Sequence, residues 1–262
     1  MPSRRKLGAP EVYSRLLVNP GGTIDVGNDD WLWLAQSGVC LVDKSLLVRD
    51  FYECRSKVAL VLRPRQFGKT LALNMLCTFF DVEYNWHPEP VSRDRRLGIF
   101  QKTRLGRQFP EFVETHCARY PVLFVSFRVR ISRQRRLTFI NFFSQNWAVA
   151  TNGTDFIRLA RQEMCLLYRQ YRYLLSGLDG ELIPQSDIDI FNRFLNNIDL
   201  GTSDLRIGLR FLVDLLSERH RSKCLVLIDD YDSPYHAAYQ NGYLSTIQEV
   251  YAPMLACVLM VS

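Results

Sequence analysis

The stretch "LRPRQFGKTLAL" (residues 62–73) decides the fold, because its end fits a phosphate-binding loop. Gly68, Lys69 and Thr70 match the last part of the pattern G-x-x-x-x-G-K-[ST]. In such a loop the glycine lets the backbone approach phosphate, the lysine supplies a cation and the threonine offers a hydroxyl to Mg²⁺. The first glycine of the pattern belongs at position 63, where this chain has Arg63. Alone, three matching residues are a weak signal, because they recur by chance.

The segments on either side of this loop predict the strand and the helix that the motif requires. "KVALVL" (57–62) is apolar on both faces, which is typical of a buried parallel strand. "LALNMLCTFF" (71–80) is rich in leucine and long enough for a helix. A short helix from Lys44 to about Cys54, with Asp43 as its N-cap, is expected before the strand. Strand, loop and helix therefore follow one another in the order that a phosphate-binding loop needs.

A second apolar run ends in two carboxylates. "CLVLIDDYD" (224–232) predicts a strand that carries Asp229 and Asp230 at its carboxyl end. A carboxylate at the tip of a parallel strand can hold Mg²⁺, and the next acidic residue stands where many ATPases orient the attacking water. The alternative is a strand that ends in a solvated turn. The presence of the loop upstream favours the metal site.

Strands and helices alternate along the chain. "PVLFVSF" (121–127) predicts a further strand, residues 153–200 are helical in pattern with Ser186 as a cap, and 203–219 form an amphipathic helix. This alternation predicts an α/β fold with a mostly parallel sheet, helices on both faces and a helical insertion. The final run "ACVLMVS" (256–262) fits either a central strand or a helix that continues past Pro253.

Composition narrows the class of protein. The chain has 262 residues with 47% hydrophobic content, enough for a sizeable core. Its seven cysteines are scattered without a C-x-x-C pair, which predicts reduced thiols that pack as small hydrophobes. No apolar run approaches the roughly 18 residues of a membrane helix, and no secretory signal pattern is present. We therefore expect an intracellular protein, cytoplasmic or nuclear, without a membrane partner.

Positive charge is concentrated locally. The net charge is +6, and arginines gather at residues 93–96 and 128–136. Such clusters can attract phosphate backbones, but they are more often solvated faces. Because aromatic side chains are not interleaved with these arginines, nucleic acid is the less favoured partner.

Four segments together resemble a known family. They are "LVDKSLLVRDF" (41–51), "LRPRQFGKTLALNMLCTFF" (62–80), "YPVLFVSFR" (120–128) and "LVLIDDYDSPYHAAYQNGY" (225–243), in this order and spacing. They resemble the AAA-ATPase-like domain commonly found ahead of a PD-(D/E)XK nuclease-like segment. That family also lacks the first glycine of the loop, so Arg63 resembles the family's own version of the motif.

The resemblance implies ATP and Mg²⁺ as cofactors and assigns roles to residues of this sequence. The phosphate-binding role falls on the residues of the loop, which are Arg65, Gly68, Lys69 and Thr70. The metal role falls on Thr70 and Asp229. The catalytic role falls on Asp230, where the family more often has glutamate, and Asp232 matches a family aspartate whose role the sequence does not explain.

The resemblance also sets expectations for the domains and the function. We expect a loosely packed N-terminal extension over residues 1–40. A P-loop NTPase-like three-layer domain should follow over 41–262, truncated at its C-terminus because the lid and the nuclease-like segment of similar proteins are absent. The expected function is Mg²⁺-dependent ATP binding with slow hydrolysis, used as a conformational switch. The alternatives are a nucleotide- or partner-binding module without turnover, which can include self-association through an open sheet edge, and a nucleic-acid-associated protein.

Overall fold

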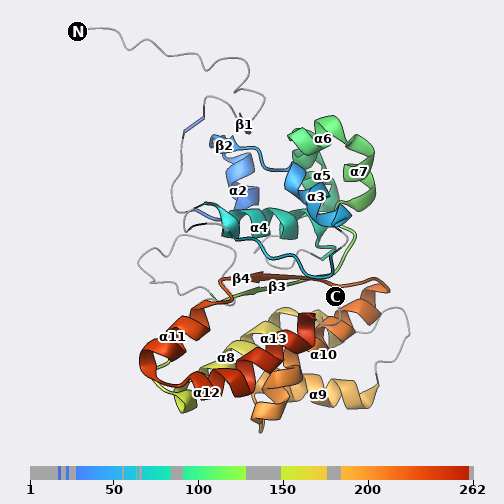
Figure 1. Ribbon diagram of the computed structural model, residues 1–262. Coiled ribbons are helices and arrows are strands. Elements are labelled where there is room, and N and C mark those ends of the chain that lie inside the picture. The colour runs from blue at the N-terminus through green and yellow to red at the C-terminus, as the bar shows by residue number, and fades with distance from the viewer. Residues whose placement is uncertain are drawn as a thin grey trace, which may run out of the picture.

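Helices dominate the computed structural model, and a small parallel sheet lies between two groups of them (Figure 1). The structure describes residues 17–18, 22–23, 28–54, 56–62, 64, 67–83, 91–127, 149–175 and 184–259. In chain order, the elements of the N-terminal half are β1 (Leu17–Val18), α2 (Trp31–Gln36), β2 (Leu41–Val42), α3 (Leu46–Glu53), α4 (Lys69–Phe80), α5 (Arg93–Gln101), α6 (Arg104–Gln108), α7 (Pro110–His116) and β3 (Val122–Ser126). Those of the C-terminal half are α8 (Gly153–Gln170), the 3₁₀-helix η2 (Arg172–Leu175), α9 (Gln185–Asn196), α10 (Thr202–His220), β4 (Leu225–Asp229), α11 (Ser233–Asn241), α12 (Leu244–Thr246), the π-helical turn η3 (Ile247–Tyr251) and α13 (Ala252–Leu259).

The sheet is formed by β3 and β4, both of which the apolar runs predicted. The two strands run parallel, with Val122 opposite Leu225 and Ser126 opposite Asp229. Parallel strands in register bring their carboxyl ends to the same edge of the sheet. Ser126 and Asp229 therefore lie side by side where both strands end. β1 and β2 form a separate antiparallel pair.

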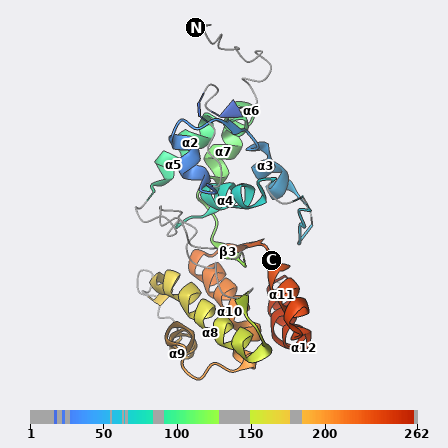
Figure 2. The same cartoon turned by 90° about the vertical axis from the view of Figure 1, so that its left-hand side faces the viewer.

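Helices cover both faces of this sheet, as Figures 1 and 2 show from two directions. Val122 and Phe124 belong to the hydrophobic cluster of the N-terminal helices, whereas Leu123 and Val125 belong to that of the C-terminal helices. Successive side chains of a strand point to opposite faces, which explains this alternation. Because both faces are covered, β3 is buried at all of its positions and its sequence is apolar almost throughout.

α4 forms the centre of the N-terminal group. Its last residues, Phe79 and Phe80, are fully buried. The Phe79 ring meets the Phe100 ring edge-on at 4.9 Å, and Trp31 of α2 stacks on Phe100 at 4.5 Å. Trp31, Leu32 and Leu34 of α2 are thus buried. The expectation that residues 1–40 are loosely packed is wrong for this helix, because its apolar side chains have a covered face of α4 to pack against.

The C-terminal group packs around α10. Leu205, Leu209, Leu212 and Leu216 are buried at helical spacing, which confirms the predicted amphipathic helix. α9 begins differently from the prediction: its N-cap is Pro184, and Ser186 lies inside the first turn. A proline fits the start of a helix because the first N–H groups have no partner within the helix, so the serine is not needed there.

The apolar run 57–62 is not a strand, contrary to the prediction. It has no regular secondary structure, and Leu60 and Leu62 are 60% and 72% exposed. A strand forms only where another strand supplies hydrogen-bond partners. In the part of the chain that the structure describes, β4 pairs with β3 alone and this run pairs with neither. The pattern was correct about apolar character and wrong about its burial.

The end of the described chain is helical, so the strand alternative for "ACVLMVS" is wrong up to Leu259. The π-helical turn η3 leads directly into α13, with Pro253 as the second residue of α13. Among the described residues, no helix is both long and apolar enough to cross a membrane. Taken together, the helices and strands form a helix-rich α/β fold with a small parallel sheet.

Candidate functional site

The N-terminus of α4 is set by Gly68. Its backbone is left-handed, with φ 74° and ψ 29°, and its carbonyl accepts the first helical hydrogen bond from Ala72 at 2.9 Å. A residue with a Cβ would raise the free energy of the folded chain by about 1–2 kcal/mol in this conformation. No side chain of the described residues caps this helix start. The positive end of the helix dipole lies here, which is a favourable place for an anion. Lys69 and Thr70 form the first turn and are both half-buried.

Thr70 lies against the carboxyl end of β4. Its Oγ1 donates a hydrogen bond to Oδ2 of Asp229 at 2.9 Å, although 159 residues separate them in sequence. Asp229 is buried, and Ser126 at the end of β3 donates to the same oxygen at 3.4 Å. The structure therefore brings together the two residues to which the sequence assigned the metal.

The donor set at this point fits Mg²⁺. One carboxylate from Asp229 and one hydroxyl from Thr70 lie within hydrogen-bond distance of each other. Mg²⁺ prefers oxygen ligands and is usually held by one or two carboxylates together with substrate phosphates, with water completing the shell. Among the described residues, no group of three or more His, Cys, Asp or Glu side chains gathers as a metal site would. The pairing of one carboxylate with one hydroxyl suits a cation that arrives with phosphates.

Asp230 follows directly and has an unusual backbone. Its φ is 52°, in the left-handed region that non-glycine residues rarely adopt, and its carbonyl accepts the N–H of Ser233 at 3.0 Å. This turn ends β4 and starts α11. Backbone conformations of this kind cluster at functional sites because the surrounding structure must hold them. Asp230 is half-buried, one residue beyond the buried Asp229.

The remaining predicted residues are less informative. Asp232 stands at the N-cap position of α11, largely exposed, with its carboxylate 3.3 Å from His236. This is a surface pair one helical turn apart, and such pairs contribute little to stability. Arg65 and Arg63 lie outside the described residues. The structure therefore unites the first turn of α4 with the end of β4 and leaves the arginines of the loop untested.

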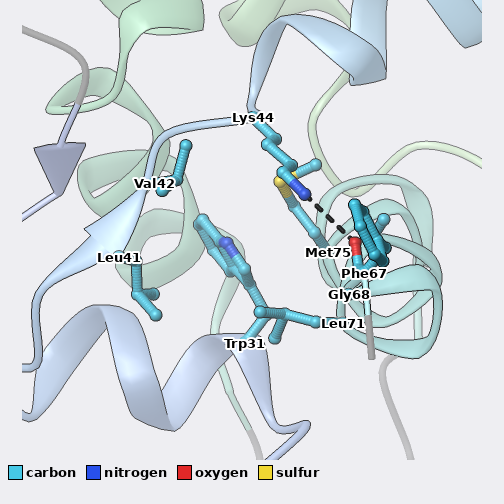
Figure 3. Close-up of a pocket in the computed structure, with 9 residues that line it drawn as sticks. Trp31, Leu41, Val42, Lys44, Phe67, Gly68, Leu71 and Met75 are labelled. Carbon is cyan, nitrogen blue, oxygen red and sulfur yellow. Dashed lines mark hydrogen bonds between the residues drawn. The ribbon is translucent and has the colours of Figure 1, made fainter. Parts of the chain in front are cut away.

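A pocket of about 300 Å³ adjoins Gly68, and the sequence did not predict it (Figure 3). One wall comes from the N-terminal segment and the other from the loop and α4. The apolar side chains of these walls are Trp31, Leu41 and Val42 on one side and Phe67, Leu71 and Met75 on the other. A concave apolar pocket with a few polar groups is the usual form of a small-molecule site.

Lys44 is a functional candidate that sequence reasoning missed. Its Nζ donates a hydrogen bond of 3.2 Å to the carbonyl oxygen of Phe67, the residue directly before Gly68. The backbone of this segment is fixed by the buried Asp43, which accepts the N–H groups of Ser45 at 3.0 Å and Arg104 at 2.7 Å. α3 begins at Leu46, so Lys44 precedes the helix it was predicted to start. The only hint in the sequence was that Lys44 lies in the segment 41–51, one of the four segments that resemble the family. The contact itself joins residues 23 positions apart, so no local pattern predicts it.

The first arginine cluster is engaged in the fold. Arg96 is buried and donates to the carbonyls of Thr78 and Asp81 at the end of α4, where the helix dipole favours a cation. Arg93 donates to backbone carbonyls, at 3.2 Å and 2.6 Å. Arg95 donates to a glutamine side chain at 2.7 Å. Arg96 is therefore structural, whereas Arg93 is half-buried and Arg95 is exposed. The second cluster, 128–136, lies outside the described residues.

Comparison with known families agrees with the resemblance found in the sequence. A family model described as predicted AAA-ATPase matches residues 25–258. The match includes both halves of the candidate site, the first turn of α4 and the end of β4. No curated protein and no solved structure matches the chain.

Proposed function

Because the chain belongs to the predicted AAA-ATPase family, we propose that it binds ATP with Mg²⁺ and hydrolyses it slowly as a conformational switch. The observation that carries this proposal is the hydrogen bond of 2.9 Å between Thr70 and Asp229. It joins the two groups that a Mg²⁺-nucleotide site needs, on two elements distant in sequence. If Asp229 only ended a strand in a solvated turn, this contact with the first turn of α4 would not be expected.

Each residue of the site then has a role. Lys69 and the backbone N–H groups at the start of α4 bind the β- and γ-phosphates. Thr70 and Asp229 hold Mg²⁺, which when bound neutralises charge on the phosphate oxygens. Asp230 orients the attacking water. Arg65 would add a further phosphate contact, since a guanidinium pairs well with phosphate oxygens.

The finer features of the fold belong to the same proposal. We assign residues 41–262 to a P-loop NTPase-like three-layer domain and residues 1–40 to an N-terminal extension. The packing of helices on both faces of β3 and β4 supports the layers. The extension is in part built into the domain, because Trp31 of α2 packs in the core. The intracellular location, cytoplasmic or nuclear, stays a prediction from the sequence.

Nucleotide binding without turnover is the second candidate. Asp230 is one methylene shorter than the glutamate more common in the family, so its carboxylate reaches less far toward an attacking water. This single position favours a module that holds ATP and changes state on binding alone. A role with nucleic acid is not favoured by the arginines of α5, which are engaged in backbone and side-chain contacts. Association with a protein partner or a second copy is a further proposal, supported by the exposed run 57–62.

Thermal melting tests the proposed function. ATP with Mg²⁺ at about 100 times its dissociation constant should stabilise the fold by about 2.7 kcal/mol, which is about 5–10 °C in a chain of this size. The same ATP with a chelator should give a smaller shift. Lys69→Ala should lose the shift, whereas Lys102→Ala, a matched change at an exposed lysine after α5, should keep it. An equal shift in Lys69→Ala would overturn the proposal.

A further inference from the structure

We propose that Tyr251 is a positioning residue for Asp230, because its hydroxyl holds the turn after β4 in the conformation that ATP hydrolysis requires. Tyr251 is the last residue of the π-helical turn η3. The inference rests on the proposed function, since Asp230 is the residue to which that proposal assigns the attacking water. It adds a residue of the C-terminal helices to a site otherwise built from the first turn of α4 and the ends of β3 and β4.

Hydrogen bonds to its carbonyls close the turn after β4. The Asp230 carbonyl accepts the Ser233 N–H at 3.0 Å. The next carbonyl, that of Tyr231, accepts the Tyr251 hydroxyl at 2.7 Å, across 20 residues of sequence. The φ of Asp230 is 52°, and a residue with a side chain keeps such a backbone only where its surroundings hold it. Tyr251 supplies this support at the residue adjacent to Asp230.

The ring that carries this hydroxyl is fixed in position. Tyr251 is fully buried, and its ring meets the rings of Phe127 and Tyr235 edge-on at 5.0 Å and 5.6 Å. Phe156 of α8 packs on it from a third element, at 6.4 Å. The N–H of Phe127 also donates to the Asp229 carbonyl at 2.9 Å, so the ring packs on the strand ends that carry the site. Edge-to-face contacts of this kind fix a ring in one orientation, and a fixed donor holds its acceptor in place.

The backbone that presents Tyr251 is unusual as well. η3 is a π-helical turn of five residues that leads directly into α13. Ile247, Val250 and Tyr251 of this turn are all buried. π-Helical turns are rare and are frequent at functional sites. An uncommon turn thus brings the tyrosine to the uncommon backbone of Asp230.

Burial alone accounts for a hydrogen bond of this kind but not for its location. A buried tyrosine usually finds a partner for its hydroxyl, and Tyr168 is an example in the same hydrophobic cluster. Tyr168 is also fully buried, and its hydroxyl donates to the Gly208 carbonyl, again at 2.7 Å. Burial raises the pKa of both tyrosines, so both hydroxyls stay protonated donors at neutral pH. The two differ in the acceptor, since only that of Tyr251 adjoins Asp230.

Replacing each tyrosine by phenylalanine separates positioning from stability. Tyr251→Phe and Tyr168→Phe each remove one buried hydroxyl and one bond of 2.7 Å to a backbone carbonyl. Both should lower the melting temperature by similar amounts. Tyr251→Phe should lower kcat for phosphate release about tenfold or more and leave the Kd of Mg-ATP within about twofold of the wild type. Tyr168→Phe should keep both kcat and Kd within about twofold.

Amide hydrogen exchange measures the turn itself, without nucleotide. The Ser233 N–H closes the turn on the Asp230 carbonyl, so its exchange rate reports opening of the turn. In Tyr251→Phe, exchange at Ser233 should be about tenfold faster than in the wild type. Tyr168→Phe should leave this rate close to that of the wild type, although it loses similar stability.

Every other outcome counts against the inference. If kcat, or exchange at Ser233, changes no more in Tyr251→Phe than in Tyr168→Phe, Tyr251 serves stability alone. A loss of Mg-ATP affinity equal to the loss of kcat would place Tyr251 in binding rather than in positioning Asp230. A wild type that binds Mg-ATP but releases no phosphate overturns the proposed hydrolysis, and the inference with it. That failure is distinguishable, because it is seen in the wild type before any variant is made.

Discussion

Thr70 Oγ1 and Asp229 Oδ2 are 2.9 Å apart, and this hydrogen bond joins the first turn of α4 to the end of β4. Two features of the sequence produce it. The apolar face of α4 packs on the sheet, which fixes the depth of the helix, and Gly68 starts the helix at a defined residue. Ser126 supports the same carboxylate from β3. The pair is thus held by three elements of the fold.

Thr70→Val tests whether this pair binds the metal. Valine keeps the branched shape of threonine and removes the hydroxyl. We expect about a tenfold increase in the Mg²⁺ concentration needed for ATP binding, because a hydrogen-bonding partner of a charged group is lost. Thr115→Val, the same change on the exposed side of α7, is the control. ATP titrations at graded Mg²⁺ measure this, and an unchanged midpoint in Thr70→Val would count against the metal site.

The roles of the two aspartates should separate. Asn tolerates the left-handed backbone at position 230 better than most residues, so Asp230→Asn removes the charge without adding strain. It should leave stability and ATP binding intact and abolish phosphate release. Asp229→Asn should instead weaken Mg²⁺-dependent binding. Phosphate release and ATP affinity are measured for both variants. If both only lower the melting temperature, the pair is structural.

Gly68→Ala should damage both stability and binding. There is room for a methyl group, since its nearest neighbour would be Lys44 Nζ at 3.7 Å, but φ 74° is unfavourable for alanine. The expected cost is about 1–2 kcal/mol in the free energy of unfolding, with weaker ATP binding as the loop shifts. Gly98→Ala in α5 is the control, because no atom stands within 4 Å and its φ is not positive, so alanine should stabilise by about 0.5–1 kcal/mol. Denaturant melts give both values. Equal effects of the two substitutions would contradict the role of Gly68.

The exposed apolar run should promote self-association. Val58, Leu60 and Leu62 are each about half exposed or more, on a segment without strand partners among the described residues. Exposed apolar segments of this kind attract other chains. Leu60→Ser combined with Leu62→Ser should shift the chain toward the monomer without lowering the melting temperature. Sedimentation velocity at several concentrations measures this. A wild type that remains monomeric throughout would show that this segment is not an interface.

Stability should fall in mildly acidic solution. Burial lowers the pKa of His220, in the last turn of α10, and burial also lowers the pKa of His116. Below the ordinary histidine pKa of about 6.5, the unfolded chain therefore binds more protons than the folded chain. The stability present above about pH 6.5 is lost as pH falls through the lowered pKa values. Denaturant melts from about pH 7.5 to 5.5 should show this decline, and His220→Gln should reduce its slope. If stability falls with pH at the same slope in His220→Gln as in the wild type, His220 does not contribute to the decline.

Elements with strong local signals were predictable from the sequence. The leucine spacing of α10, the apolar run of β4 and the leucine-rich start of α4 each encode their own structure. The approach of Thr70 to Asp229 was also predictable, although no local pattern spans 159 residues, because the proposed Mg²⁺-phosphate site would require both groups.

Features that depend on distant partners were not predictable. The run 57–62 has the composition of a buried strand, but strand formation depends on a neighbour that composition does not reveal. The contacts of Trp31 with Phe100 and of Lys44 with Phe67 depend on how helices and loops pack. The left-handed backbone of Asp230 is set by the turn between β4 and α11, and the presence of an aspartate in the sequence does not predict this conformation.

The most direct test of the central claim is calorimetric titration of ATP with Mg²⁺ into three proteins: the wild type, Lys69→Ala and Lys102→Ala. Lys69 lies in the first turn of α4, whereas Lys102 is an exposed lysine at the end of α5. The account predicts saturable binding of one ATP by the wild type and by Lys102→Ala, and loss of binding in Lys69→Ala with an unchanged melt of the unliganded protein. Equal binding by Lys69→Ala, or no binding of ATP by the wild type, would contradict it.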